Sequence, residues 1–385
     1  MIHIEQYNSI FSIYIYLILV IPAVILAFFE KKSKILNVLI SVVMLNLLFR
    51  LKTMQINQLL LFFIIEVFLI YVYYFIKKKR DSKWIYYLIF VLSVIPLAIV
   101  KLAAHSEYAD IIGFVGISYI SFKIWEVIIQ IHDQKIEELK PLDLLGFLIF
   151  APSFSSGPIM RFDLFMKESE KKITRTEYFD EYFIPGLKKI VLGAFYKFSV
   201  AFLINEFVIS EYDKLSFKAA GVHLYAYTLY LFFDFAGYSL MAVGTSYLMG
   251  IKMPDNFNKP FLARNIKEFW ERWHISLSTW FNDFLFSRFV LNNMRNGRFK
   301  DTKKAARWGY VITMMTMGIW HGLYLHYILY GLYHGVWLVL TDKWLKTKTF
   351  RKVKKMRHYN LISRLITFHI IAFGMLIFSG FLISI

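Results

Sequence analysis

Long apolar runs separated by short polar segments make up most of this 385-residue chain. A run of about 20 mainly apolar residues is long enough to cross the hydrocarbon core of a bilayer as a helix. Nine runs are candidates, some of them shorter: Ile10–Phe29, Ile35–Phe49, Ile56–Ile76, Trp84–Val100, Asp110–Ile131, Leu187–Val208, Ala219–Phe235, Gly237–Gly250 and Leu361–Phe381. The pattern predicts an all-α, polytopic membrane protein.

Two further apolar stretches predict breaks in the helices. The segment Leu144–Pro158 is too short to cross comfortably and ends in Pro, Ser and Gly. It predicts a re-entrant segment, because irregular backbone at membrane depth needs protein or water around it. The run 311–340 is too long for one ordinary span and contains four glycines. It predicts two helices that meet near Gly322, which brings the expected number of spans to about 11.

The segment "FWERWHISLSTWFNDFLF", which begins at Phe269, mixes aromatic and polar residues at helical spacing. At about 100° per residue, the apolar and mainly aromatic residues fall on one arc of a helix and the polar residues on the opposite side. The first arc holds Phe269, Trp270, Trp273, Leu277, Trp280, Phe281 and Phe284, and the opposite side holds Glu268, Arg272, Ser276, Thr279 and Asp283. This pattern predicts an amphipathic helix at an interface or along a cavity. His274 lies at the border of the aromatic arc, and Ser278 follows one turn later.

Composition narrows the class of protein. The chain is 58% hydrophobic and its mean hydropathy is +0.50, which excludes an ordinary soluble domain. No long polar stretch could form a separate soluble part, so we expect a single membrane-embedded domain over residues 1–385. The sequence has no cysteine, which excludes disulfides, thiolate metal sites and a cysteine nucleophile.

The net charge of +18 is concentrated in short loops, at 31–34, 77–83 and 343–357. Basic loops of this kind follow the positive-inside rule and attract anionic lipid. They predict a cytoplasmic side for these loops and an outside location for the N-terminus. The first apolar run lacks a basic segment before it and a cleavage site after it, so it is expected to be a retained span. A nucleic-acid partner is a poor explanation, since no basic face belongs to a water-soluble unit.

Three histidines, His321, His326 and His334, lie in an apolar stretch without any Asp, Glu, Lys or Arg. An ionisable residue in a membrane segment suggests a functional site, although a neutral histidine bonded to a neighbouring helix is the alternative. Glycines beside His321 allow another backbone or a ligand to approach closely. His326 and His334 fit packing or interfacial roles. Two histidines without clustered carboxylates make a poor metal site, so acid–base chemistry is the better hypothesis for His321 and His274.

Acidic residues within the apolar runs need partners. Lys123 and Glu126 lie three residues apart in one run and are expected to neutralise each other. Asp234 is either the structural partner of a buried Arg or Lys or part of the site. Glu66 has no evident partner in its run.

The segment 288–307 carries seven Lys and Arg residues against one Asp. It is either an ordinary positive-inside loop or a docking platform for an acidic cytoplasmic partner. The second interpretation rests on apolar residues beside the charge. The residues expected at this platform are Val290, Leu291, Met294, Arg295 and Arg298.

Three stretches in this order resemble the membrane-bound O-acyltransferase (MBOAT) superfamily: "FAPSFSSGPIMRF" at 150–162, "FFDFAGYSLMAVGTSYLMGIKMPDNFNKPFLARNIKEFWERWHISLSTWF" at 232–281, and "MGIWHG" at 317–322. The resemblance covers residues 85–340 at motif level. Within the family it is similar to the branch that D-alanylates teichoic acid. The alginate O-acetyltransferase branch usually has Asp at the position of Leu240 and is generally longer.

This resemblance implies a ring of helices around a thinned centre with a tunnel through it. The family's nearly invariant histidine corresponds to His321, as general base, and its second histidine to His274, which would orient the substrate or stabilise an oxyanion. Trp320, Trp273, Ser278 and Asp234 are the expected tunnel residues.

The resemblance also implies the substrates and partners. The donor would be D-alanine, held as a thioester on the 4'-phosphopantetheine arm of an acidic, cytoplasmic carrier protein. The acceptor would be a hydroxyl on the outer side, ultimately of lipoteichoic acid in a Gram-positive cell wall. Other membrane proteins of the same operon would assist, and we expect no bound cofactor and no metal.

Two other classes of function remain as alternatives. A transporter or flippase of a lipid-linked precursor would also use broken helices, but it predicts inverted internal repeats, which the sequence lacks. A structural membrane scaffold explains neither the broken helices nor the histidine in an apolar run.

Overall fold

The structure, a computed structural model, describes residues 7, 9–49, 53–106, 112–212 and 216–383. Within these residues it consists of helices, with one isolated β-bridge and no strand, which confirms the all-α prediction. The chain packs as two compact units, residues 1–195 with 237–254 and residues 196–236 with 255–385. The prediction of a single domain over the whole chain stays a prediction.

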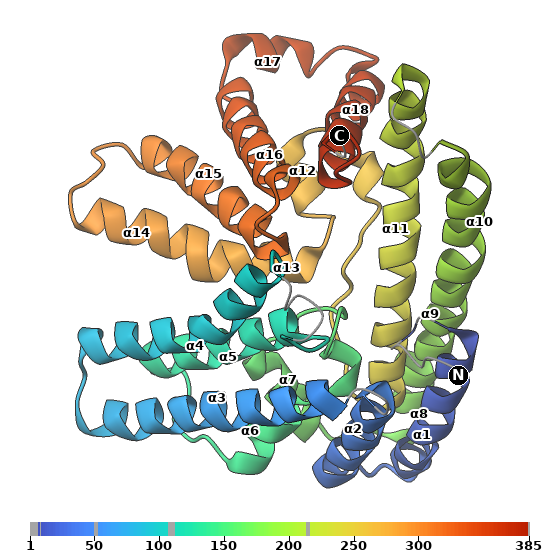
Figure 1. Cartoon of the computed structure of the whole chain (residues 1–385), viewed down its shortest axis with the longest axis vertical. Coiled ribbons are helices and arrows are strands. Elements are labelled where there is room, and N and C mark those ends of the chain that lie inside the picture. The colour runs from blue at the N-terminus through green and yellow to red at the C-terminus, as the bar shows by residue number, and fades with distance from the viewer. Residues whose placement is uncertain (1–6, 8, 50–52, 107–111, 213–215, 384–385) are drawn as a thin grey trace. The chain divides into compact units, whose positions relative to one another are not determined.

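The first unit is built from the N-terminal helices. They are α1 (Ile10–Phe28), α2 (Lys34–Phe49), α3 (Thr53–Lys79), α4 (Lys83–Ala103), α5 (Ile117–His132), α6 (Pro141–Leu148), α7 (Phe162–Glu170), α8 (Arg175–Tyr178), α9 (Ile184–Phe195) and the C-terminal part of α11 (Phe217–Leu248). Helices α3, α4 and α5 pack side by side (Figure 1).

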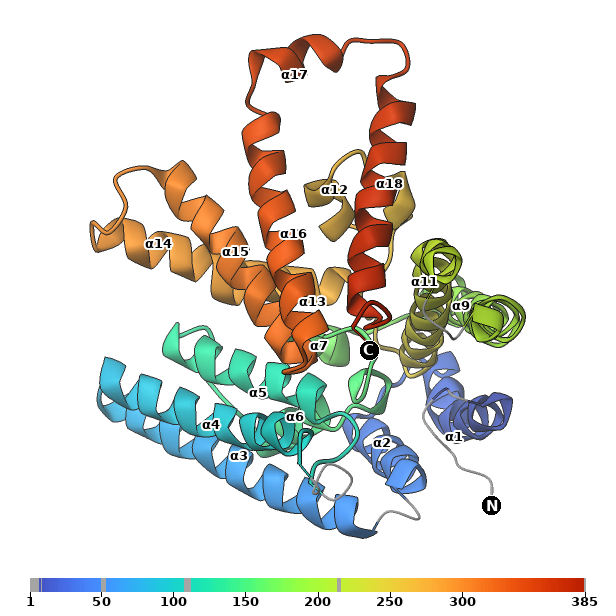
Figure 2. The same cartoon turned by 45° about the horizontal axis from the view of Figure 1, so that its top comes forward.

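The second unit contains the first part of α11 and the C-terminal helices. They are α10 (Phe202–Ile204), α12 (Ile266–Trp270), α13 (Ile275–Phe281), α14 (Ser287–Arg295), α15 (Thr302–His321), α16 (Leu325–Trp344), α17 (Lys348–Val353) and α18 (Tyr359–Phe378). Figure 2 shows α16 beside α18, with α17 joining them at one end.

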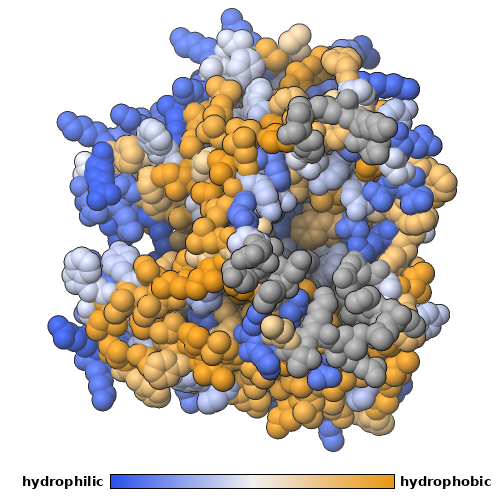
Figure 3. All heavy atoms as spheres, in the orientation of Figure 1, coloured by the Kyte–Doolittle hydropathy of each residue, from blue (hydrophilic) through white to orange (hydrophobic). Residues whose placement is uncertain are grey.

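Five of the described helices are long and apolar enough to cross a membrane: α1, α3, α4, α11 and α18. Helix α2 is apolar but shorter. Their outward faces are apolar, as on α3, where Leu60, Ile64 and Phe68 are exposed. Figure 3 shows hydrophobic residues over α3 and hydrophilic ones at the lower left, where α3 connects to α4. The chain is thus a multi-pass membrane protein, and the expected count of about 11 spans is not confirmed.

The chain from Phe217 to Leu248 forms one helix of 32 residues, whereas the sequence predicted two spans separated near Gly237. The helix continues through Gly237, whose carbonyl oxygen lies at a close approach of α9. A Cβ at Gly193 of α9 would lie 2.6 Å from the Gly237 carbonyl oxygen. Gly186 and Gly244 make a second close approach of the same two helices. Small residues let helix backbones pack this closely.

The expected span Asp110–Ile131 starts later than predicted. Asp110 lies outside the described residues, and α5 begins at Ile117 after a left-handed Gly116 with φ +96°. A Cβ at Gly116 would also meet the Phe154 carbonyl oxygen at 2.8 Å. The helix therefore starts where a close contact with the broken segment requires glycine.

The predicted break after α6 is present, and two buried charges on α5 stabilise it. The Lys123 ammonium donates to the carbonyl oxygens of Phe147 and Leu148, 2.9 and 3.5 Å away, at the end of α6. The Glu126 carboxylate accepts from the backbone N–H of Phe162, 2.9 Å away, at the start of α7. Both side chains are fully buried. The two interact electrostatically, but the ion pair of Glu126 is with Arg161, 3.5 Å away. Lys123 and Glu126 each satisfy a helix end that lacks an intrahelical partner.

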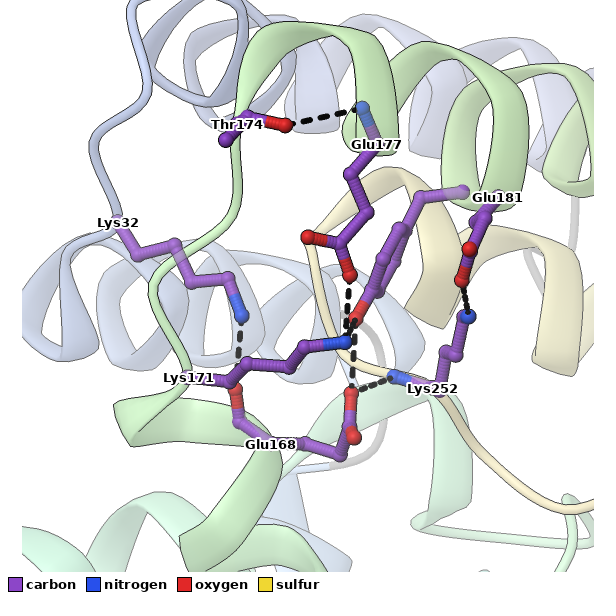
Figure 4. Close-up of polar contacts among 8 residues, drawn as sticks. Lys32, Glu168, Lys171, Thr174, Glu177, Glu181 and Lys252 are labelled. Atoms are coloured by element: carbon purple, nitrogen blue, oxygen red, sulfur yellow. Dashed lines mark hydrogen bonds and ion pairs between the residues drawn. The ribbon is translucent and has the colours of Figure 1, made fainter.

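A second buried carboxylate, Glu168 at the end of α7, organises a cluster of charges (Figure 4). Its carboxylate accepts from the Tyr182 hydroxyl at 3.2 Å and from the Lys252 backbone N–H at 3.1 Å, and its carbonyl oxygen accepts from the Lys32 ammonium at 2.7 Å. We call the residues in and around these contacts the Glu168 cluster: Lys32, Glu168, Lys171, Glu177, Glu181, Tyr182 and Lys252.

The lysines of the Glu168 cluster are balanced by glutamates. Lys171 pairs with Glu177 at 2.6 Å, and Lys252 pairs with Glu181. The hydrogen bond that the Lys171 ammonium donates to Glu177 raises the pKa of Lys171. Burial lowers the pKa of Lys32 to about 8, because its ammonium has lost much of its water.

The run 311–340 contains two helices, α15 and α16, which confirms the prediction of a break near Gly322. The glycines bring the two backbones together. A Cβ at Gly318 would lie 2.3 Å from the Tyr327 carbonyl oxygen, and one at Gly331 would lie 2.6 Å from the Met314 carbonyl oxygen. Helix packing therefore accounts for these glycines.

Candidate active site

His321 is the last residue of α15, where the helix ends before α16 begins. Its imidazole is half-buried among aromatic rings. The ring centroids of Phe378 and Trp320 lie 4.9 and 4.6 Å from that of His321, and Phe378 meets it edge-on. Tyr327 of α16 lies at 5.8 Å. These rings place a titratable side chain in a largely apolar setting.

His274 lies between α12 and α13 and is 4% exposed. Its backbone is left-handed, with φ +45°, which is uncommon for a residue other than glycine. Asn256 holds the following turn, because its carbonyl oxygen accepts from the Ile275 N–H at 2.9 Å and its amide oxygen accepts from the Ser276 hydroxyl at 2.6 Å. Phe235 packs edge-on against the imidazole at 4.7 Å. Strained backbone fixed by its surroundings is typical of functional sites.

The expected continuous amphipathic helix is interrupted at His274. A β-bridge between Phe257 and Trp273 replaces helical hydrogen bonds there, so α12 ends at Trp270 and α13 starts at Ile275. The prediction of a continuous helix was wrong because hydrophobic periodicity does not report pairing with a segment about fifteen residues earlier in the chain. The members of the aromatic arc other than Phe284 are buried.

His274 and His321, the two histidines selected from the sequence, interact electrostatically. His334 is fully buried between Trp270 and Tyr330, with ring centroids 5.2 and 4.7 Å away, and His326 packs on Tyr327 at 4.1 Å. Packing positions of this kind fit the roles expected for His326 and His334.

A pocket of about 390 Å³ lies among α12, α13, α15, α16 and the π-helical turn η7 (Asn282–Phe286). We call it the α13–α15 pocket. Its lining includes Ile275, which follows His274, and Met317, which lies one turn before His321. Ser278 also lines it and donates to the Trp273 carbonyl oxygen at 3.2 Å. The pocket therefore extends towards both histidines.

The other expected tunnel residues lie in different surroundings. Trp273 is buried in an aromatic cluster, stacked on Phe269 at 5.4 Å. Trp320 packs on His321. Asp234 forms an ion pair with the mostly buried Lys197, as the structural alternative for this carboxylate expects. A role of these three residues in lining a tunnel stays a prediction.

The expected docking residues lie on and just after α14. Leu291, Arg295 and Arg298 are exposed, and Leu291 and Arg295 are one turn apart on the helix. Met294 is half-buried, and Val290 packs towards α15, where its methyl would meet a Cβ at Gly309 at 3.3 Å. Four of the five thus give an apolar and basic surface, and Val290 supports the helix beneath it.

A third feature, an ion cluster at Asp342 of α16, is one that no pattern in the sequence predicted. Three cations contact this buried carboxylate, from α12, α15 and the end of α16: Lys267 at 2.9 Å, Arg307 at 3.3 Å and Lys346 at 2.7 Å. Lys267 also lines the α13–α15 pocket. Although burial lowers the pKa of Lys267, hydrogen bonds with Tyr310 and Asp342 raise it overall.

In the part of the chain that the structure describes, no group of three or more His, Cys, Asp or Glu side chains could hold a metal ion. The candidate site comprises two imidazoles, a pocket and a cluster of cations. This set suits proton transfer at a bound organic substrate.

Comparison with known proteins identifies the family. A family model described as MBOAT, membrane-bound O-acyltransferase family, matches residues 38–383. The chain is 38% identical to the teichoic acid D-alanyltransferase of Bacillus subtilis over 388 residues, 97% of this chain and 98% of that protein. It is 38% identical to that of Streptococcus thermophilus over 400 residues, 99% of this chain and 96% of that protein.

The alginate branch is more distant and matches in part. A probable alginate O-acetylase of Pseudomonas syringae is 33% identical over 270 residues, 69% of this chain and 48% of that protein. The family match covers most of the chain and includes all three motifs that carried the resemblance. The chain therefore belongs to the membrane-bound O-acyltransferase family and is an acyltransferase.

Proposed function

We propose that this chain transfers D-alanine from a carrier-protein thioester to a hydroxyl acceptor, for the D-alanylation of teichoic acid. The observation that carries the proposal is identity of 38% over nearly the whole length of two proteins with that activity in their names. The alginate relatives are matched over about half their length.

His321 acts as the general base in this proposal. Its imidazole takes the proton of the acceptor hydroxyl as the oxygen attacks the thioester carbonyl carbon. The tetrahedral intermediate then collapses, the C–S bond breaks, and the thiolate takes the proton back from the imidazolium. An ester and a free thiol result. General-base catalysis of this kind contributes ~10²–10⁴-fold.

His274 acts as the partner of His321. Its fixed left-handed backbone holds the imidazole in one place, which suits a donor that orients the thioester or stabilises the oxyanion. A single donor of this type is worth ~3 kcal/mol of transition-state stabilisation. Aromatic rings around both imidazoles exclude water, which protects the thioester from hydrolysis.

The 4'-phosphopantetheine arm occupies the α13–α15 pocket, and its carrier protein docks on Leu291, Met294, Arg295 and Arg298. The basic charge of this surface suits an acidic carrier protein. The carrier lies in the cytoplasm and the N-terminus outside, so that the acyl group crosses while the carrier does not. Lipoteichoic acid is the ultimate acceptor, reached through other membrane proteins of the same operon.

The test is a reconstituted assay with the purified chain in lipid nanodiscs, D-[¹⁴C]alanyl carrier protein and lipoteichoic acid, with and without the operon's other membrane proteins. We expect loss of the thioester and labelling of the acceptor, both dependent on the chain. Transfer of acetyl groups to alginate instead would assign the alginate branch. Translocation of a lipid-linked precursor without thioester cleavage would support the transporter alternative.

A further inference from the structure

The cluster at Asp342 has more positive charge than its carboxylate can neutralise. Lys267, Arg307 and Lys346 all contact Asp342, whose side chain is 4% exposed. One carboxylate among three cations leaves a surplus of two positive charges. We call these four residues the Asp342 cluster. A local surplus of this size, next to a cavity, attracts an anionic ligand.

Lys267 connects the cluster to the α13–α15 pocket. Its ammonium donates to one Asp342 oxygen at 2.9 Å and lies 4.8 Å from the centroid of the Tyr310 ring, and both Lys267 and Tyr310 line the pocket. These two contacts hold the ammonium beside Tyr310, the first α15 residue of the pocket lining. Glu271 is the one acidic residue in the described lining, and it is exposed, so that water weakens its repulsion.

The opposite end of the pocket points to the histidines. From Tyr310 to His321 the helix α15 advances eleven residues, or ~16 Å at ~1.5 Å per residue. The wall between them contains Met314 and Met317 on α15 and Ile275 on α13. An elongated ligand with an anionic group at one end and a reactive group at the other fits this arrangement.

We propose that the Asp342 cluster is the binding subsite for the phosphodiester of the carrier's phosphopantetheine arm, with Lys267 as the contacting cation and Asp342 as a positioning residue. This inference rests on the proposed function. Lysine binds phosphate as a point charge, and the surplus charge supplied by Arg307 and Lys346 strengthens the attraction.

An anionic lipid headgroup carries the same phosphodiester chemistry. The pocket favours the arm, because its lining follows α15 from Tyr310 to Met317, one turn before His321, and includes the apolar side chains of Ile275 and Met314. The Asp342 cluster would thus determine how far the arm enters the pocket, so that the thioester lies at the His321 imidazole.

The test measures binding of the carrier protein, with and without its phosphopantetheine arm, to the chain in nanodiscs. For the unaltered chain we expect the carrier with the arm to bind about tenfold more tightly than the carrier without it. Lys267→Gln should reduce that ratio to near one and leave the armless carrier's affinity unchanged. Lys267→Arg should restore most of the ratio. The matched control is Lys343→Gln, which replaces an exposed lysine next to Asp342 and should leave the affinity ratio unchanged.

Other outcomes overturn the inference. If Lys267→Gln keeps the ratio, or weakens both forms equally, the cluster holds no phosphodiester of the arm. Free 4'-phosphopantetheine should compete better than pantetheine, and equal competition would also contradict it. An effect of Lys267→Gln in phosphatidylglycerol nanodiscs that is absent in phosphatidylcholine nanodiscs would assign the cluster to lipid. Absence of any carrier binding by the unaltered chain would instead contradict the proposed function, on which the inference rests.

Discussion

Two buried carboxylates, Glu168 in one unit and Asp342 in the other, each lie in a cluster with three basic residues. The two clusters differ in their balance of charge. In the Glu168 cluster three lysines are matched by three glutamates. Two lysines form ion pairs with Glu177 and Glu181, and the Lys32 ammonium bonds to the Glu168 carbonyl oxygen. The Glu168 carboxylate bonds to the Tyr182 hydroxyl and a backbone N–H. In the Asp342 cluster three cations share one carboxylate beside a pocket.

The difference separates a structural cluster from a binding one. Balanced charges whose hydrogen bonds are satisfied inside the protein have no need of a ligand, so the Glu168 cluster joins the segments around α7. Surplus positive charge beside a cavity is stabilised when an anionic ligand binds there. Counting charges against partners therefore distinguishes two clusters that look alike in composition.

The largest expected effect is on stability, at Glu168. Glu168→Ala leaves the Tyr182 hydroxyl and the Lys252 N–H without their acceptor, which should cost on the order of 2–4 kcal/mol of unfolding free energy. Acyl transfer per folded molecule should stay the same. Unfolding by SDS titration and the transfer assay measure the two quantities. Glu170→Ala, two residues away and exposed, is the control, and equal losses in both variants would remove the structural role of Glu168.

The next effect is on transfer, at Asp342. Asp342→Asn should lower the rate of transfer from the loaded carrier about three- to tenfold, because Lys267 loses the group that holds it at the pocket. The unfolding free energy should fall by only ~1 kcal/mol, since the three cations are partly exposed. Asp301→Asn changes the charge equally and keeps the N-cap of α15, so it serves as control. If Asp342→Asn leaves the rate of transfer unchanged, the Asp342 cluster has a structural role only, like the Glu168 cluster.

The smallest effect is a pH dependence at Lys32. Its pKa is lowered to about 8 from an ordinary 10.5, so between these values the unfolded chain holds a proton that the folded chain has released. Stability from this group therefore rises with pH across that window. The melting temperature of the unaltered chain, relative to Lys32→Met, should increase by a few degrees or less from pH 8 to pH 10. A difference that is constant with pH would show that Lys32 is not desolvated in the folded state.

The apolar pattern predicted most of the helices because a helix that crosses a membrane requires a long run of apolar residues in the sequence. Helices α1 to α4 and α18 agree with the predicted runs within a few residues, and the break before α16 was predicted from Gly322 and its neighbours. Gly237 led to a wrong prediction by the same reasoning, since a glycine inside a helix that packs closely on α9 cannot be told by sequence from one that ends a helix.

The site was predictable in part, for a similar reason. His321 stood out as an imidazole in an apolar run, and His274 was selected through a motif. The bridge between Phe257 and Trp273 and the cations around Asp342 join residues that are distant in sequence. Such pairings follow from tertiary packing, which a single sequence does not encode as a local pattern.

The most direct test of the central claim is a single-turnover measurement with His321→Ala. The unaltered chain and the variant are compared for release of D-alanine from the loaded carrier to the acceptor, and for affinity for the carrier with its arm. We predict at least a 100-fold loss of transfer with unchanged carrier affinity. Transfer at the rate of the unaltered chain would contradict the assignment of His321 as the general base.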